Sequence, residues 1–385
     1  MRIFISTGEV SGDLQGGLLV EALYRQAAAA GIPLEIVALG GDRMAAAGAE
    51  LLGNTKGIGS VGLLEAIPFI LPTLQVQKAA KQYLKNNPPD LIVLIDYAGP
   101  NNVIGNYARQ HLPNVPIVYY IAPQYWIWTP FPNDIKKMIA VTDRLLAIFP
   151  EEARFFEKRG VSVGWVGHPL VDRLQNPPKR EEARQELGIA PDELAISLFP
   201  VSRRQEVKYL FPNLFSAARE VQEQLPQVRY IISLSLPVYR KPIQEQIDKH
   251  GLKAIIWEGH SLTAMAAADL AIAKSGTVNL EIALMGIPQL VVYRLSPITL
   301  GFARTVLKYP SPFLAPPNLV LMEPIVPELF QEEATPENIA QNAIDLLLNR
   351  ERRNKMLHDY QRMRDCLGEA GVCDRAAREI LEYRK

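Results

Sequence analysis

Short apolar runs rich in β-branched residues alternate with longer segments of helical period along almost the whole chain. Such alternation is typical of parallel sheets with helices on both faces. We therefore predict an α/β fold built from two doubly wound, Rossmann-like domains. The expected strands are residues 2–6, 35–39, 91–96, 116–121, 144–149 and 164–166 in the first half, and 194–199, 229–233, 254–257, 269–273 and 289–293 in the second.

A polar stretch with three prolines separates the two halves. Residues 173–193 carry Pro177, Pro178 and Pro191, which indicates a connector between domains. The chain has 385 residues, and at about 150 residues per domain we place one domain at 1–172 and the next at 173–365. Ligands of such sheets bind beyond the carboxyl ends of the strands, so two facing sheets predict a deep cleft.

Charge and hydropathy exclude several classes of protein. The chain has 41 Lys plus Arg and 41 Asp plus Glu, so nothing in its net charge favours nucleic acid, although a local basic patch stays open. The longest apolar stretch, residues 61–71, is interrupted by Glu65 and Pro68, and we expect no membrane-spanning helix. The start lacks a signal-peptide pattern, and we expect Cys366 and Cys373 to be reduced in a cytoplasmic protein.

Residues 200–206 form a first candidate anion site. The sequence Pro-Val-Ser-Arg-Arg-Gln-Glu follows a buried strand and opens a helix expected to run towards Leu225. Backbone amides at a helix start, the Ser202 hydroxyl and the Arg203 guanidinium suit an anion. A plain helix cap with solvated arginines explains the same residues equally well.

Residues 275–281 form a second candidate. Ser275, Gly276 and Thr277 let a phosphate approach the backbone, and Glu281 can accept hydrogen bonds from ribose hydroxyls. A Ser/Thr followed by Glu also forms an ordinary capping box. Two such turns in one domain favour a nucleoside diphosphate.

Other phosphate sites and metals fit less well. Residues 8–13, Gly-Glu-Val-Ser-Gly-Asp, lack the glycine spacing of the NAD fingerprint, and Glu9 would repel a pyrophosphate. The sequence has no Walker loop, no Asp pair spaced for a divalent cation and no histidines at metal-ligand spacing. We therefore expect no metal or cofactor, and neutralisation of a leaving group by Arg and helix ends.

Nine short motifs occur in order along the chain, and together they resemble the lipid-A-disaccharide synthase family of inverting GT-B glycosyltransferases. The motifs are Gly8–Asp13, Gly40–Met44, Asp96, Trp126–Trp128, Gly167–Leu170, Ser202–Arg203, Ser275–Thr277 with Leu280–Glu281, Tyr293–Arg294 and Pro317–Leu319.

The resemblance implies a reaction and a place for it. A diacylated glucosamine would pass from UDP to the 6-hydroxyl of diacylglucosamine 1-phosphate, giving a β-1,6 disaccharide and UDP at the inner face of the plasma membrane. In GT-B enzymes a C-terminal helix, here about residues 366–385, often packs back on the first domain, although it could equally dock on a partner subunit in a homodimer.

The resemblance also assigns residues. Asp96 would be the base that deprotonates the acceptor hydroxyl, with a strand-end cap as its alternative role, and Arg203 would stabilise the diphosphate charge. The donor-side residues would be Ser202, Arg203, Glu206, Ser275, Gly276, Thr277, Glu281 and Asn318. The acceptor-side residues would be Gly8, Glu9, Ser11, Gly12, Asp13, Trp126 and His168, the last of which also fits a structural role.

The chain departs from the family pattern at three places. Gly99 stands where a second aspartate usually follows the first, so acceptor contacts should differ. Val201 replaces a glycine and disfavours positive φ, so the turn should change shape. Gln124 and Tyr125 replace small residues beside Trp126.

A lipid contact is expected in the first domain. The apolar residues 61–74 precede Lys78, Lys81 and Lys85, which suits an interfacial segment, although burial against the sheet explains the same leucines. Two other functions stay open at this point. One is a UDP-sugar epimerase or a transferase with a soluble acceptor, and the other is a degenerate membrane-associated binding protein.

Overall fold

A computed structural model describes residues 1–55, 70–127, 129, 131–296 and 313–383. The described residues form two compact units, of which unit 1 holds residues 1–173 and 367–383, and unit 2 holds those between 174 and 366. Each unit contains one sheet in which all the paired strands are parallel. The expectation of two doubly wound α/β domains is therefore confirmed.

Unit 1 is built on a seven-stranded sheet, sheet A, with the order β3-β2-β1-β4-β5-β6-β7. Its elements in chain order are β1 (Arg2–Ser6), α1 (Glu9–Ala29), β2 (Glu35–Gly40), α2 (Asp42–Ala46), β3 (Glu50–Asn54), α4 (Ile70–Asn86), β4 (Leu91–Ile95), α5 (Ala98–His111), β5 (Ile117–Tyr120), α6 (Pro132–Val141), β6 (Arg144–Ala147), α7 (Pro150–Glu157), β7 (Val163–Trp165), α8 (Leu170–Arg173) and α19 (Val372–Glu382).

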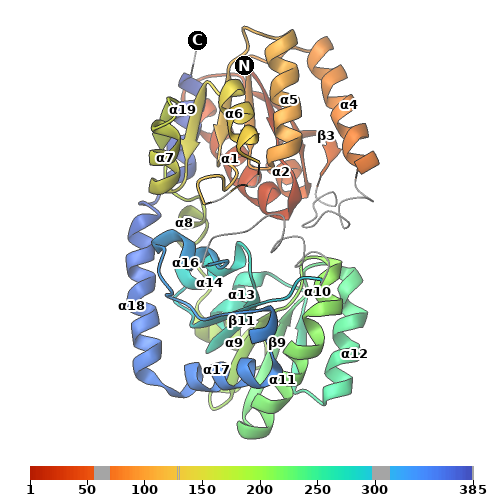
Figure 1. Cartoon of the computed structure of the whole chain (residues 1–385), viewed down its shortest axis with the longest axis vertical. Helices are drawn as coiled ribbons and strands as arrows, with labels where there is room; N and C mark the ends of the chain where they lie inside the picture. The colour runs from red at the N-terminus through yellow and green to blue at the C-terminus, as the bar shows by residue number, and fades with distance from the viewer. Residues whose placement is uncertain (56–69, 128, 130, 297–312, 384–385) are drawn as a thin grey trace. The chain divides into compact units, whose positions relative to one another are not determined.

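Helices cover both faces of sheet A because its central strands are apolar throughout. Tyr119 packs in the cluster that joins the sheet to α4, α5 and α6 (Figure 1). The next residue, Tyr120, points to the opposite face, as the period of a strand requires. There it lies by Cys373 of α19, which packs beside α1.

The C-terminal helix α19 is held in unit 1 by polar contacts as well as by packing. Asp172 of α8 accepts hydrogen bonds from the backbone N–H groups of Gly371, Val372 and Cys373, at 2.6, 3.1 and 2.7 Å. A carboxylate at these amides satisfies the free donors of the helix start and its dipole. Ion pairs join Asp374 to Arg25 and Glu379 to Arg144.

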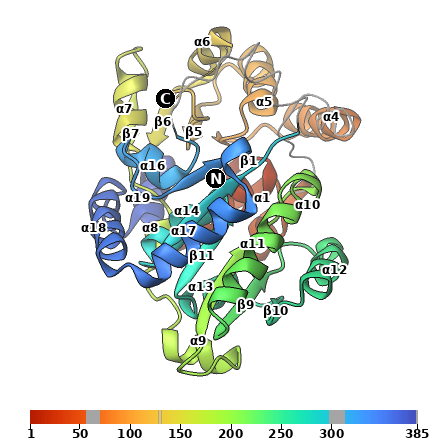
Figure 2. The ribbon, with the colours of Figure 1, turned by 60° about the horizontal axis from the view of Figure 1, so that its bottom comes forward.

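Unit 2 is built on a six-stranded sheet, sheet B, with the order β10-β9-β8-β11-β12-β13. Helices α11 and α17 lie side by side on it (Figure 2). Its elements are α9 (Arg180–Glu186), β8 (Leu194–Phe199), α10 (Arg204–Tyr209), α11 (Phe211–Gln224), β9 (Val228–Ser233), η2 (Pro237–Tyr239), α12 (Arg240–His250), β10 (Ala254–Trp257), α13 (Ser261–Ala266), β11 (Leu270–Lys274), α14 (Val278–Leu284), β12 (Gln289–Tyr293), α16 (Pro316–Leu321), β13 (Glu328–Phe330), η4 (Gln331–Glu333), α17 (Pro336–Leu348) and α18 (Arg350–Cys366).

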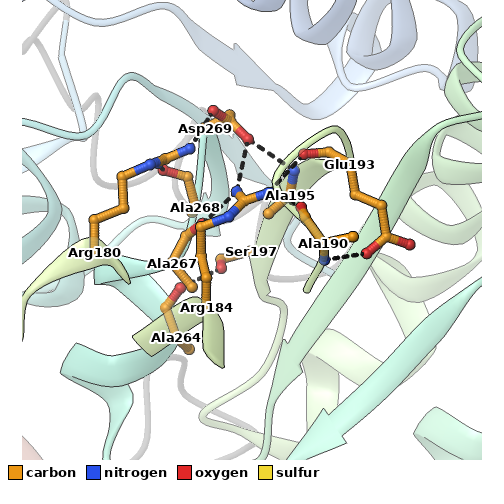
Figure 3. A network of polar contacts seen from close by, with 10 residues as sticks. All are labelled: Arg180, Arg184, Ala190, Glu193, Ala195, Ser197, Ala264, Ala267, Ala268 and Asp269. Carbon is orange, nitrogen blue, oxygen red and sulfur yellow. Dashed lines mark hydrogen bonds and ion pairs between the residues drawn. The ribbon is translucent and has the colours of Figure 1, made fainter. Parts of the chain in front are cut away.

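A polar network fixes the amino-terminal edge of sheet B (Figure 3). The buried Arg184 of α9 donates to the carbonyls of Ala190 and Glu193 at 2.6 and 2.7 Å and also contacts Asp269. Asp269 in turn accepts the backbone N–H of Ala195 at 2.9 Å. One guanidinium therefore ties α9 to the starts of β8 and β11, at the edge opposite the loops that follow these strands.

Replacing Arg184 should destabilise unit 2. We expect Arg184→Ala to lower the free energy of unfolding by about 3 kcal/mol, because it leaves buried carbonyls and a carboxylate without their donor. Urea denaturation measures this. Arg180 also pairs with Asp269, but its side chain is 42% exposed, so Arg180→Ala should cost less than about 1 kcal/mol. Equal losses for the two variants would contradict the assignment.

Within the described residues, none of the helices combines the length and the apolarity needed to cross a bilayer.

Candidate functional site

Asp96 lies at the point in sheet A where the strand order reverses. Strands β1 and β4 are parallel neighbours, with Ser6 opposite Leu94, and the chain leaves them towards opposite sides of the sheet order. Ligands of doubly wound sheets bind beyond the carboxyl ends of the strands at this switch point. Asp96, which follows β4, and Gly8, which follows β1, therefore lie at the expected binding edge of unit 1.

The backbone of Asp96 is held in an unusual conformation. Asp96 and Tyr97 have φ values of 45° and 51°, and such left-handed residues cost about 1–3 kcal/mol each when they are not glycine. The N–H of Asp96 donates to the carbonyl of Ile121 at 2.9 Å, and its own carbonyl accepts from Asn101 and Tyr119 at 2.7 and 2.9 Å. Asp96 is exposed, and the N-cap of the following helix α5 is Tyr97, not Asp96.

A buried amide that the sequence analysis missed joins the ends of β1 and β4. Asn101 accepts a hydrogen bond from the Ser6 hydroxyl at 2.7 Å and donates to the carbonyls of Ile95 and Asp96 at 3.0 and 2.7 Å. Its complete burial requires such partners. The polar pair Asn101-Asn102 in the sequence of an otherwise amphipathic helix was the only available signal.

The Gly8–Asp13 motif serves mainly to pack unit 1. A Cβ at Gly8 would collide with the ring of Tyr97, and one at Gly12 would collide with Thr7. The buried carboxylate of Asp13 accepts the backbone N–H groups of Gly41, Arg43 and Met44 at 2.9, 3.2 and 3.1 Å. Asp13 therefore holds the start of α2, and this corrects its assignment as an acceptor contact. Ser11 is partly buried, and the side chain of Glu9 lies outside the described atoms.

Trp126 and His168 are linked through one aromatic ring. The ring of Phe149 lies 5.5 Å from that of Trp126 and 5.3 Å from that of His168. His168 is only 3% exposed, its Nδ1 accepts the N–H of Leu170, and burial lowers its pKa to about 3. His168 is therefore a neutral wall residue at pH 7, and the expectation that it reaches a sugar or phosphate is corrected. Trp128 lies outside the described residues.

Unit 2 brings its two candidate turns to the switch point of sheet B. Strands β8 and β11 are parallel neighbours, with Phe199 opposite Ala273, and the strand order reverses between them. The turns that follow them therefore lie side by side at the binding edge. The residues of these turns that remain partly exposed are Ser202, Arg203, Ser275, Gly276 and Thr277.

Glu206 supports the first turn from inside. Its buried carboxylate accepts the backbone N–H groups of Ser202 and Arg203 at 2.5 and 2.8 Å. The amides offered to an anion by the sequence are thus already occupied, and Glu206 is a supporting residue, not a ligand contact. The expected long helix is also divided, because α10 ends at Tyr209 and α11 begins at Phe211. Val201 is buried and does not have a positive φ.

The second turn is held by Asn279, not by a capping box. Gly276 donates its N–H to Oδ1 of Asn279 at 2.8 Å, and the hydroxyl of Ser275 donates to the carbonyl of Leu314 at 2.8 Å. Thr277 makes no side-chain capping bond, and Glu281 is buried in α14. A Cβ at Gly276 would lie 2.7 Å from Nζ of Lys274, so the glycine makes room for a cationic side chain that the sequence analysis did not consider.

Asn318 also serves the framework of unit 2. It donates to the carbonyl of Val326 at 2.9 Å and to Glu328 at 2.6 Å, and it accepts the N–H of Val326 at 2.8 Å. With 1% exposure its amide positions β13, which corrects its assignment as a donor contact. Among the described residues, no group of His, Cys, Asp or Glu is arranged to hold a metal ion.

Known proteins similar to this chain share a single name. A family model described as lipid-A-disaccharide synthetase matches residues 3–382. A protein of Gloeothece citriformis named lipid-A-disaccharide synthase is 62% identical over 383 residues, covering both chains in full. One of the same name from Synechocystis sp. is 55% identical over 385 residues and covers 100% of this chain and 98% of the relative.

Solved structures similar to this chain act on different substrates. One is UDP-GlcNAc 2-epimerase from Neisseria meningitidis bound to UDP-GlcNAc, with a TM-score of 0.70, 13% identity and full coverage of both chains. Another is MurG of Acinetobacter baumannii, with a TM-score of 0.57, 17% identity and 99% coverage of each chain. At such identities the likeness shows the fold alone, and it confirms the expected GT-B architecture.

Proposed function

The chain belongs to the lipid-A-disaccharide synthase family of glycosyltransferases, and we propose that it joins UDP-diacylglucosamine to diacylglucosamine 1-phosphate. The product would be a β-1,6-linked disaccharide, formed with inversion, together with UDP. The observation that carries this proposal is the family match over residues 3–382. The position of Asp96 at the switch point of sheet A supports it.

The proposed reaction needs one base and one stabilised leaving group. Asp96 takes the proton from the acceptor 6-hydroxyl while that oxygen attacks the anomeric carbon of the donor. The bond from the anomeric carbon to UDP breaks, and its electron pair passes to the diphosphate. Arg203, with the Ser202 hydroxyl, stabilises the negative charge that develops there.

An assay with defined acylated substrates tests the function. The purified chain, incubated in detergent micelles with UDP-diacylglucosamine and diacylglucosamine 1-phosphate, should release UDP and form a disaccharide that mass spectrometry identifies. We propose that no metal is needed, so the rate should be the same in excess EDTA. Turnover of UDP-GlcNAc without a lipid product would indicate an epimerase and overturn the proposal.

We further propose that helix α4 brings the enzyme to the cytoplasmic face of the inner membrane. Two leucines in its first turns, Leu71 and Leu74, are 71% and 54% exposed. Lys78 and Lys85 follow on the same helical face and are also exposed. Apolar residues beside cations suit the boundary between acyl chains and anionic headgroups. The rest of the apolar stretch predicted to contact lipid, residues 56–69, lies outside the described residues.

Binding to vesicles tests this surface. We expect the double variant Leu71→Ser/Leu74→Ser to bind phosphatidylglycerol vesicles at least about tenfold more weakly in sedimentation, because each inserted leucine contributes about 1 kcal/mol or more. The control variant Val238→Ser/Leu348→Ser alters comparably exposed residues of unit 2 and should bind normally. Equal binding of both variants would exclude α4 as the contact.

A further inference from the structure

Glu152 is a fully buried carboxylate that the proposed reaction does not use. It lies in the first turn of α7. One oxygen accepts the N–H of Ala122 at 2.7 Å, and the other accepts those of Ile148 and Phe149 at 2.8 and 3.2 Å. None of the ion pairs found among the described residues includes it. A single carboxylate thus joins the loops that follow β5 and β6.

The bond to Ala122 leads directly to Asp96. The peptide group between Ile121 and Ala122 donates its N–H to Glu152, and its carbonyl accepts the N–H of Asp96 at 2.9 Å. One rigid, planar peptide therefore lies between the two acidic residues. If this peptide rotates, the anchor of the Asp96 backbone moves with it.

The same peptide is strained. Ile121 has a φ of 63°, a conformation that is a genuine outlier for a β-branched residue. Asp96, on the other side of the hydrogen bond, also has a positive φ. Strained residues persist only where their surroundings over-determine them. Glu152 supplies one such constraint, and the N–H of Ile121, which donates to Leu146 at 3.1 Å, supplies another.

We propose that Glu152 is a positioning residue, whose carboxylate fixes the Ile121–Ala122 peptide and through it the direction of the Asp96 side chain. This inference rests on the proposed role of Asp96 as the base. Glu152 itself touches no substrate. Its contribution is geometric, and a misplacement of about 1 Å at a reacting group can lower a rate by about 10²-fold.

The protonation state of Glu152 should affect this role near neutral pH. Burial raises the pKa of Glu152 to about 7, the charge of Asp96 raises it further, and the three backbone N–H groups oppose the rise. Below that pH one oxygen becomes a hydroxyl donor, and the carboxyl group then accepts fewer of the three amides. The other titratable groups around it are His168, with a pKa of about 3, and Tyr120, whose pKa burial raises well above 10. Neither changes its charge near pH 7.

The test compares two adjacent glutamates. Glu152→Gln puts an amide NH₂ against a backbone donor and should lower kcat about 10- to 100-fold, with KM and the Kd for UDP changed less than twofold. Its acidic limb near pH 7 should also disappear from the kcat profile. Glu151→Gln is the control, because Glu151 is exposed and pairs with Arg154 only, and it should behave as wild type. Adding Ile121→Gly to Glu152→Gln removes the backbone strain and should restore part of kcat.

A fluorescence titration tests the same coupling without substrate. Trp126 lies in the loop that begins at Ala122 and packs against Phe149, so tryptophan emission of the wild type and of Glu151→Gln should change with a midpoint near pH 7. That transition should be absent from Glu152→Gln. Its presence there, a change in kcat below twofold, or a variant that fails to fold or loses UDP binding would overturn the inference. A wild-type chain that forms no disaccharide but titrates as described would instead contradict the proposed function.

Discussion

Asp96→Asn should lower kcat about 10²- to 10⁴-fold, the range that a general base contributes. Asparagine has almost the same shape as aspartate, so the backbone bonds to Ile121, Asn101 and Tyr119 stay in place. Only the ability to accept a proton is lost. The measurement is UDP release under saturating substrates, together with calorimetric titration of UDP, whose Kd should change less than twofold.

A carboxylate elsewhere in unit 1 provides the control for Asp96. Asp134 of α6 is partly exposed and pairs with Lys137, and Asp134→Asn should leave both kcat and UDP binding within twofold of wild type. Retention of more than a tenth of the wild-type kcat by Asp96→Asn would exclude Asp96 as the base, because such a loss is too small for proton transfer.

Arg203→Gln should lower kcat about 10²- to 10³-fold, since stabilisation of developing charge by a preorganised donor is worth about that much. The effect should be larger on kcat than on the Kd for UDP, because the diphosphate gains charge only as the glycosidic bond breaks. Arg203→Lys should recover only part of the loss, since lysine lacks the planar fork that binds two phosphate oxygens. Single-turnover kinetics separate the chemical step from product release.

The neighbouring arginine provides a matched control for Arg203. Arg204 is exposed at the first position of α10, and Arg204→Gln keeps the bonds from the backbone of Ser202 and Arg203 to Glu206. It should stay within twofold of wild type. Similar losses for Arg203→Gln and Arg204→Gln would mean that a general positive potential acts in place of a specific contact.

The strands predicted from the sequence were those that are buried on both faces. β4 and β8 are almost continuous apolar runs, and such runs distinguish parallel strands from their surroundings. The strands β3 and β13 were missed. β3 is only partly buried and contains Gly53, and β13 has three residues, so neither carries a periodic pattern long enough to be recognised.

The site residues divide along a similar line. The positions of Asp96 and of the two turns in unit 2 followed from strand ends, which the alternation of apolar runs locates well. The direction in which a polar side chain points did not follow. Asp13, Glu206 and Asn318 have the right chemistry for ligand contacts, yet each is buried and bonded to backbone groups, two of them far along the chain. Such partners depend on the tertiary fold and leave no signal in local spacing.

The capping of α19 by Asp172 bears on how the chain is synthesised. Unit 1 begins with the first residues to leave the ribosome, yet its last helix is among the final segments to emerge. Unit 2, which is translated in between, can bury its whole sheet first. During elongation the partner face of α1 therefore waits uncovered through about half of translation, and a nascent chain of this kind offers an apolar surface to trigger factor or similar holdases until termination.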